Sequence, residues 1–229
     1  MNTDEIKKMF DCAVHVGHRT QKWNPRMKKF IYGERNGIHI INLEKTYEYL
    51  EKALAFLSKC VAEGKNVLFV STKPQSVKLL EEAAKECRMP YVVSKWIPGL
   101  ITNFSTIKTR IKYLSDLKHQ EETGEFDKYT KKEISKLKKI IDKLQLSLGG
   151  VQNLTSRPDV LFVVDALRDR IVVKEAKRLR IPVVGIVDTN TDPTIVDYPI
   201  PGNDDAIKSL TYFIEKIKEV FQASGKAKK

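Results

Sequence analysis

Short apolar runs alternate along the chain with segments of helical periodicity. Each run is almost continuously apolar and rich in β-branched residues, instead of alternating between apolar and polar positions. The runs lie at 66–70, 91–93, 160–164 and 182–187. Continuous apolar runs of this length are typical of strands that are buried on both faces, as in a parallel sheet. We therefore predict that these segments form the strands of a parallel sheet.

Helical periodicity fills the intervals between the runs and the stretch after the last one. The expected helices cover 74–87, 168–180 and 203–222. Pro74 suits a first helical position, and Asn203 suits an N-cap after the chain breaker Pro201-Gly202. Strands that alternate with helices in this way predict βαβ units and an open α/β fold.

Residues 15–42 interrupt this alternation near the beginning of the chain. The segment is rich in His, Trp, Asn, Pro and cations. It predicts an extended loop followed by a short strand or hairpin at 37–41. A long helix is expected over 43–62, before the first strand of the sheet.

Residues 104–148 form a second interruption, with two apolar stripes whose steps are three and four residues. The stripes flank a turn at Thr123-Gly124, and Thr130 and Glu133 have the spacing of a capping box. This pattern predicts an antiparallel helical hairpin, and it carries 11 Lys or Arg against 7 Asp or Glu. We expect an α/β domain formed by 1–103 and 149–222, the hairpin inserted at 104–148, and a disordered basic tail at 223–229.

The charge of the chain indicates an anionic partner. Its 229 residues include 41 Lys plus Arg and 29 Asp plus Glu, so the formal net charge is +12. Nucleic acid and an anionic membrane surface are the candidates. The densest charge lies in an irregular loop and not on an amphipathic helix, and no apolar run approaches the roughly 18 to 20 residues of a membrane span, so the membrane is disfavoured.

Three widely spaced cysteines and an N-terminus without signal-peptide features predict a protein of a reducing compartment.

An open α/β sheet invites an enzymatic interpretation, which the motifs do not support. No glycine-rich phosphate loop follows the run at 66–70, and no G-x-S-x-G nucleophile motif occurs. Aspartates at the expected strand ends, Asp165, Asp188 and Asp204, could hold Mg²⁺ or serve acid–base chemistry, and His15 or His18 could complete a metal site. The alternative is that these aspartates cap helices and form Asx turns.

The cations at 19–35 are the stronger feature. Six Lys or Arg stand there against Glu34 alone, interleaved with three aromatic residues. Spaced cations neutralise phosphates, and flat aromatic rings can stack on bases. A second such patch combines Lys95 and Trp96 with Thr102 and Asn103. The alternative for each Trp is that it anchors a long loop on the core.

Long ordered motifs resemble the small-subunit ribosomal protein S-two family of bacteria and organelles. The matching stretches are HVGHRTQKWNPRMKKFIYGERNGIHIINLEKT at 15–46, WIPGLITNF at 96–104, FDKYTKKE at 126–133, LSLGG at 146–150, RPDVLFVVD at 157–165, IPVVGIVDTNTDP at 181–193 and YPIPGNDDAI at 198–207. The resemblance covers essentially residues 4–222. The chain departs from the family at Pro98, where a first Gly of a Gly-Gly pair is usual, and the sequence stops short of the long, often acidic C-terminal extension that many members carry.

The resemblance implies a flavodoxin-like, three-layer α/β/α domain with five parallel strands in the order 2-1-3-4-5 and a projecting helical hairpin. It implies no catalysis and no cofactor. It implies a structural constituent of the small ribosomal subunit that contacts small-subunit rRNA and neighbouring ribosomal proteins, and that helps to recruit ribosomal protein S-one. No membrane and no small-molecule substrate is expected, and the location is cytoplasmic, or within an organelle if the chain is organelle-encoded.

The residues expected to face rRNA lie in the loop at 19–35, in the patch near residue 96 and on the hairpin. They are Arg19, Lys22, Trp23, Asn24, Arg26, Lys28, Lys95, Trp96, Asn103, Lys108 and Lys112. Two other function classes stay open at this point. One is a nucleotide- or metal-dependent enzyme that uses Asp165, Asp188 and Asp204, and the other is a free-standing RNA-binding regulator.

Overall fold

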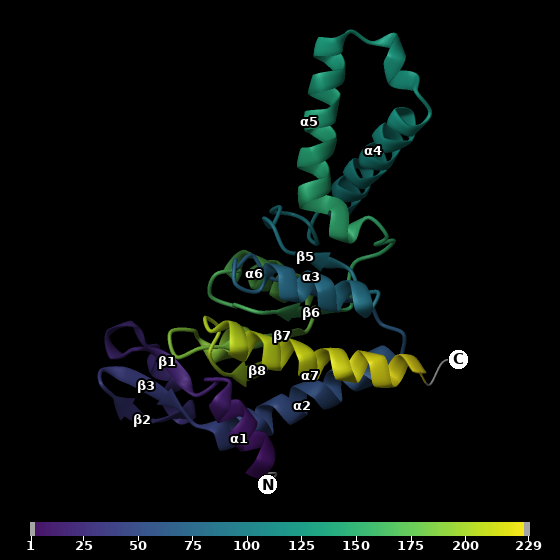
Figure 1. Cartoon of the computed structure of the whole chain (residues 1–229). Helices are drawn as coiled ribbons and strands as arrows, with labels where there is room; N and C mark the ends of the chain where they lie inside the picture. Colours follow the sequence, from purple (N-terminus) through teal and green to yellow (C-terminus); the bar gives the residue numbers. More distant parts are fainter. Residues whose placement is uncertain (1–2, 227–229) are drawn as a thin grey trace.

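The computed structural model describes residues 3–226, and its centre is a five-stranded parallel sheet (Figure 1). The strands follow one another across the sheet in the order β5-β4-β6-β7-β8. Their bounds are β4 Val67–Val70, β5 Tyr91–Val92, β6 Val160–Val163, β7 Val183–Val187 and β8 Tyr198–Pro201. In order along the chain this is 2-1-3-4-5, so the α/β fold and its topology are confirmed.

Helices cover both faces of the sheet because successive strand residues point to opposite sides. Val67 and Phe69 belong to a core shared with α2, α3 and α7, whereas Leu68 and Val70 belong to a core shared with α6 and the segment 96–107. The helix bounds are α2 Leu43–Ala62, α3 Val77–Glu86, α6 Arg170–Leu179 and α7 Ile207–Lys226. The domain therefore has the three layers that the resemblance implies.

Several helix boundaries differ from the expected ones. The chain turns at 74–76 before α3, so Pro74 is not the first residue of that helix. Asn203 caps a turn in front of α7, because its Oδ1 accepts hydrogen bonds from the N–H groups of Asp205 and Ala206. Helix α7 continues beyond residue 222 to Lys226, so 223–226 are helical and not a disordered tail, while 227–229 lie outside the described residues. An additional helix, α1 Thr3–Asp11, precedes the region of the matched motifs.

The segment 15–42 is more ordered than an extended loop. Strands β1 Val16–Arg19, β2 Ile31–Arg35 and β3 Ile38–Ile41 form an antiparallel sheet in the order β1-β3-β2, and the 3-10 helices η1 Thr20–Lys22 and η2 Pro25–Phe30 lie between β1 and β2. Asn36 and Gly37 join β2 to β3 with positive φ angles of 53° and 74°. An Asn-Gly pair of this kind makes the tight hairpin turn that suits twisted strands. The hairpin thus uses Gly37 as its turn and not as a strand residue.

The inserted segment is a helical hairpin, as expected. It consists of α4 Phe104–Glu122, η3 Glu125–Lys128 and α5 Lys131–Leu148, followed by η4 Gly149–Val151. The capping box of Thr130 and Glu133 is present. Figure 1 shows the hairpin projecting from the β5 side of the sheet, away from the small antiparallel sheet near β8. None of the helices described between residues 3 and 226 combines the length and the apolar content that crossing a membrane would require.

Candidate RNA-binding surface

The basic segment 19–35 is fixed to the carboxyl end of strand β7. The backbone N–H of Asn24 donates to the carbonyl of Thr189 at 2.7 Å, and the N–H of His18 donates to the Thr189 hydroxyl at 2.8 Å. A Cβ atom at Gly17 would lie 2.6 Å from the Thr189 methyl carbon. Only glycine leaves room there for the Thr189 side chain. The cations of this segment are therefore carried by a backbone that is tied to the end of β7.

Arg26 strengthens this attachment. Its Nη1 lies 2.5 Å from Asp192 Oδ2 and 3.1 Å from the Thr194 hydroxyl. Burial alone would raise the pKa of Asp192, but hydrogen bonds from Thr194 and Arg26 outweigh it and lower that pKa. Asn24 is also partly structural, because its Oδ1 accepts from the N–H of Arg26 and caps η2. Arg26 keeps an exposed side chain and could contact a phosphate with its remaining donors.

The other predicted residues of the segment face solvent. Arg19, Lys22 and Lys28 are exposed, and within residues 3–226 none of the three has a carboxylate within ion-pairing distance. Trp23 is 36% exposed, with its ring centroid 5.2 Å from that of His39. One ring face is thus partly covered while the rest stays accessible. Unpaired cations next to an accessible indole form a surface suited to a polyanion with flat bases.

Trp96 does not face solvent, and its expected role as an RNA contact is corrected. The side chain is 6% exposed, and its Nε1 donates to Glu175 Oε1 at 3.0 Å. A buried indole cannot stack on a base, so Trp96 anchors its loop on the core. Lys95 and Asn103 are exposed on either side of this buried stretch, and Asn103 Oδ1 accepts from the Thr106 hydroxyl at 3.0 Å.

Glu175 organises the whole segment that leads into the hairpin. Besides Trp96, its carboxylate accepts from the N–H of Gly99 at 2.7 Å and from both the N–H and the hydroxyl of Thr102, at 3.2 and 2.9 Å. Burial would raise the pKa of Glu175, but these hydrogen bonds outweigh it and the pKa is lowered. Thr102 is thus engaged and not free for RNA. Sequence reasoning missed Glu175, although an acidic residue within the buried stripe of α6 was a usable signal.

The hairpin presents its cations on the outside. Lys108 and Lys112 are exposed on α4, outside its buried apolar stripe. Among the side chains that the structure describes, none offers Lys108 or Lys112 a carboxylate within 4.0 Å. The structure therefore brings together the exposed residues of the 19–35 segment, and it places Lys108 and Lys112 on a separate, projecting element.

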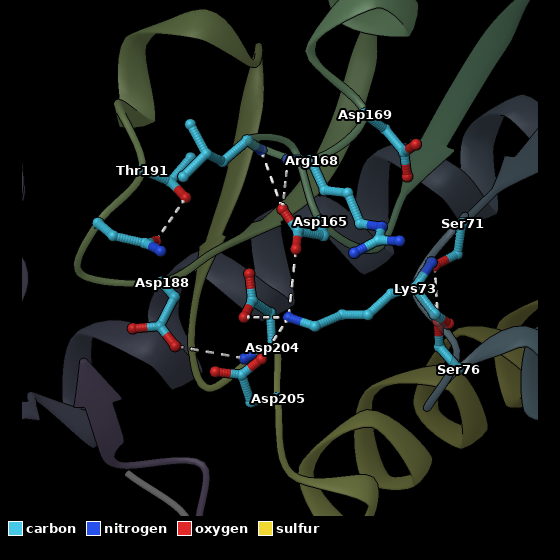
Figure 2. A network of polar contacts seen from close by, with 12 residues as sticks. Ser71, Lys73, Ser76, Asp165, Arg168, Asp169, Asp188, Thr191, Asp204 and Asp205 are labelled. Atoms are coloured by element: carbon cyan, nitrogen blue, oxygen red, sulfur yellow. Dashed lines mark hydrogen bonds and ion pairs between the residues drawn. The ribbon is translucent and has the colours of Figure 1, made fainter. Parts of the chain in front are cut away.

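The strand-end aspartates form a buried ionic cluster around Lys73 (Figure 2). Lys73 follows β4, and its Nζ lies 3.2 Å from Asp165, 2.7 Å from Asp204 and 2.7 Å from Asp205. Burial alone would lower the pKa of Lys73, but the carboxylates raise it well above the ordinary value. The order of the strands reverses between β4 and β6, and such a switch point is where open α/β sheets bind ligands. Here the lysine itself occupies that position.

His18 completes the cluster from the small antiparallel sheet. Its Nδ1 lies 3.1 Å from Asp188 and its Nε2 lies 3.3 Å from Asp205. The hydrogen bond to Asp188 raises the pKa of His18. Burial, together with the charges of Asp165 and Asp188, raises the pKa of Asp204 to about 7. The carboxylates thus face a lysine and an imidazole whose pKa they raise.

The same residues are the ones that could hold a metal ion. Ligand atoms of His18, Asp188, Asp204 and Asp205 lie within 4.8 Å of one another. Oxygen and imidazole donors suit a divalent cation such as Zn²⁺. His15 is not part of the group, since its ring stacks on Phe10 at a centroid distance of 4.3 Å. The strand-end aspartates thus lie close together, and several of their oxygens also accept local backbone hydrogen bonds as in the Asx interpretation.

Known proteins resemble this chain over nearly its full length. The family model for "Ribosomal protein S2" matches residues 9–224. The chain belongs to the ribosomal protein S2 family. The small ribosomal subunit protein uS2 of Campylobacter concisus is 48% identical over 214 residues, which are 93% of this chain and 82% of the relative. The uS2 proteins of Campylobacter hominis and of a Nitratiruptor species are each 47% identical, and the alignments cover 97% and 93% of this chain and 83% and 80% of the relatives.

Membership of the ribosomal protein S2 family decides between the function classes. The family is non-enzymatic, and its members are ribosomal proteins of the small subunit that serve translation. The chain therefore has a structural ribosomal role. The aspartates of the Lys73 cluster are accordingly explained by their ion pairs and not by catalysis.

Proposed function

We propose that the chain is a structural constituent of the small ribosomal subunit that binds small-subunit rRNA through the 19–35 segment. The observation that carries this proposal is a set of exposed cations without an ion-pair partner among the described side chains, namely Arg19, Lys22 and Lys28, on a segment that is hydrogen-bonded to the end of β7. Cations on a segment that is already held in place bind phosphates without first having to order a loop. Trp23 adds a ring for stacking, and Arg26 contributes from its position against Asp192.

A second, more distant contact would come from the other exposed residues. Lys95 and Asn103 flank the loop that Glu175 holds, and Lys108 and Lys112 extend along α4. We assign these residues to rRNA backbone contacts, because lysines act mainly as point charges toward phosphates. Contacts of this kind fix orientation and carry little sequence information.

Contacts with neighbouring ribosomal proteins and support for recruiting ribosomal protein S-one are part of the same proposal. They follow from the family resemblance, and so does a cytoplasmic location. A distinct measurement addresses them: the amount of ribosomal protein S-one on purified small subunits, with and without this protein. Subunits that lack the chain should carry less ribosomal protein S-one, and equal amounts would remove this part of the proposal.

Charge reversal tests the RNA-binding part. The variant Arg19→Glu/Lys28→Glu should be depleted from small subunits in a sucrose gradient, because two phosphate contacts turn repulsive. A matched control is Lys78→Glu/Lys208→Glu, which changes the net charge equally at exposed positions on α3 and α7. The control should be incorporated normally. Equal incorporation of both variants, each with an unchanged thermal midpoint, would contradict the proposed role of the segment.

A further inference from the structure

Helix α2 carries a regular stripe of alternating cations and aromatic rings. The stripe consists of Lys45, Tyr49, Lys52, Phe56 and Lys59, whose spacings alternate between four and three residues. Residues three and four apart lie on one face of a helix. At 1.5 Å per residue, the stripe extends over about 21 Å. We name it the α2 stripe.

The α2 stripe lines a surface groove from Tyr49 to Lys59. This groove has a volume of about 680 Å³, and Tyr198 and Pro199 of the edge strand β8 form its other side. Phe56 and Tyr198 stack at a centroid distance of 4.0 Å and an angle of 14°. Because the pair is only half-buried, part of each ring faces the groove. The pair is therefore a ready platform for a flat ligand.

The charged residues that line the groove leave an excess of lysines. Lys52 and Lys59 of α2 and Lys65 beyond its end line it, and the acidic residues there are engaged: Asp197 accepts from the N–H of Val183, and Glu63 pairs with Lys65 at 2.6 Å. The glutamates at 44, 48 and 51 line a separate hollow, which Lys45 and Lys52 also line. The ion pair between Lys52 and Glu48 is exposed to solvent, and exposed ion pairs contribute little to the stability of a protein. A phosphate could therefore replace Glu48 at low cost.

The α2 stripe is continuous with the 19–35 segment. Lys29 Nζ lies 4.7 Å from the ring centroid of Phe30 and 5.9 Å from that of Tyr49. Phe30 and Tyr49 contact each other edge to face at 4.9 Å. Lys45 Nζ donates to the carbonyl of Lys29. Phe30 itself is buried, so the surface continues from the proposed rRNA-binding segment onto α2 through Lys29, Lys45 and Tyr49.

We propose that the α2 stripe and Tyr198 bind a short single-stranded RNA segment, with phosphates at the lysines and a base on the Phe56–Tyr198 platform. Alternating cations and rings are the chemistry by which proteins hold single strands, and the stripe matches the lower end of known site sizes, on the order of four nucleotides. A duplex would not fit, because its bases are stacked and unavailable to the platform. This inference rests on the proposed function, since it extends the same RNA-bound surface.

The test uses the full chain and fluorescein-labelled decauridylate, an RNA without secondary structure, in an anisotropy titration at two salt concentrations. Lys52→Glu/Lys59→Glu should bind about tenfold more weakly and lower the salt dependence by about 1.4 in logarithmic slope. Lys78→Glu/Lys208→Glu, with the same change of charge, should lose less than about twofold. Phe56→Leu, which keeps the apolar bulk, should lose roughly fivefold through the missing stacking. Thermal midpoints establish that each variant is folded.

Other outcomes would overturn the α2 stripe as a single-strand site. One is that the stripe and control variants bind alike. Another is that an RNA duplex or polyglutamate, which stands for an acidic protein partner, competes as well as unlabelled decauridylate. If only Arg19→Glu/Lys28→Glu lost binding, the stripe would be excluded while the proposed function remained. Incorporation into small subunits reports on that function separately.

Discussion

The indole N–H of Trp96 donates to the carboxylate of Glu175 at 3.0 Å, and this contact joins the loop before the hairpin to helix α6. The same carboxylate holds Gly99 and Thr102, so one half-buried side chain sets the course of the chain into α4. Because α4 begins immediately afterwards at Phe104, Glu175 holds the loop from which the hairpin starts. The hairpin is thus attached at this end through a residue that is distant in sequence.

Replacing Glu175 with Gln should destabilise the protein. The amide would place an NH₂ group against N–H donors and leave them unsatisfied, with an expected loss of about 2–3 kcal/mol in the free energy of unfolding. Urea unfolding measures this loss. The control Glu82→Gln alters an exposed position of α3 and should change the free energy of unfolding by less than about 0.5 kcal/mol. Equal losses for both variants would show that the Glu175 contacts do not hold the loop.

Gly17→Ala tests the close approach of β1 to Thr189. The new Cβ would lie 2.6 Å from the Thr189 methyl carbon and 3.0 Å from the carbonyl oxygen of His39. Overlap of this kind should cost about 1–3 kcal/mol in the free energy of unfolding. Gly33→Ala is the matched control, since its Cβ would meet nothing within 4 Å. A Gly17 variant as stable as the Gly33 variant would contradict the tight attachment of the segment.

Lys73→Met probes the buried cluster. Removing the ammonium leaves the buried carboxylate of Asp165 without its partner and takes away the charge that favours ionised Asp204, which should cost about 3–5 kcal/mol near pH 7. Lys52→Met removes the lysine of an exposed pair with Glu48 and should cost less than about 0.5 kcal/mol. Urea unfolding of both variants measures the two losses in the free energy of unfolding. Similar small losses would mean that the cluster does not stabilise the sheet ends.

The stability of the protein should depend on pH through His18. The pKa of His18 is raised in the folded protein, chiefly by the hydrogen bond to Asp188. Protonated His18 therefore stabilises the fold fully at a pH below its pKa in the unfolded chain, about 6.5, and this stabilisation is lost as the pH rises through the pKa in the folded protein. The free energy of unfolding should therefore fall from pH 6 to pH 9 relative to that of His18→Gln. The measurement is urea unfolding in buffers with a metal chelator. Parallel pH profiles for the two proteins would contradict the raised pKa.

Continuous apolar runs were enough to predict the parallel sheet, because strands buried on both faces leave that pattern. The hairpin was likewise predictable from its two stripes and its capping box. Long-range contacts were not: nothing local shows that Lys73 meets Asp165 and Asp204, or that Glu175 meets Trp96. Trp96 was placed on the RNA surface because a tryptophan among cations has the same local pattern whether it is buried or exposed.

The Asn36-Gly37 turn is a different case. An Asn-Gly pair is a local sequence signal for a hairpin turn. The prediction nevertheless assigned Gly37 to the strand, because an apolar run follows it directly. The surface formed by 19–35 was predicted as a cluster of cations, and the structure adds what sequence could not. Thr189 and Asp192 hold the segment, so Arg26 has a second, positioning role. The assignment of individual cations in this segment to rRNA contacts belongs to the proposed function.

The central claim is that this chain works as a bound component of the small ribosomal subunit. Sucrose-gradient sedimentation of the tagged full chain from cell lysate, at low and at high salt, tests this most directly. We predict co-migration with small subunits at low salt, with weaker association as salt rises if phosphate contacts dominate. A chain that stays at the top of the gradient at low salt would contradict the account.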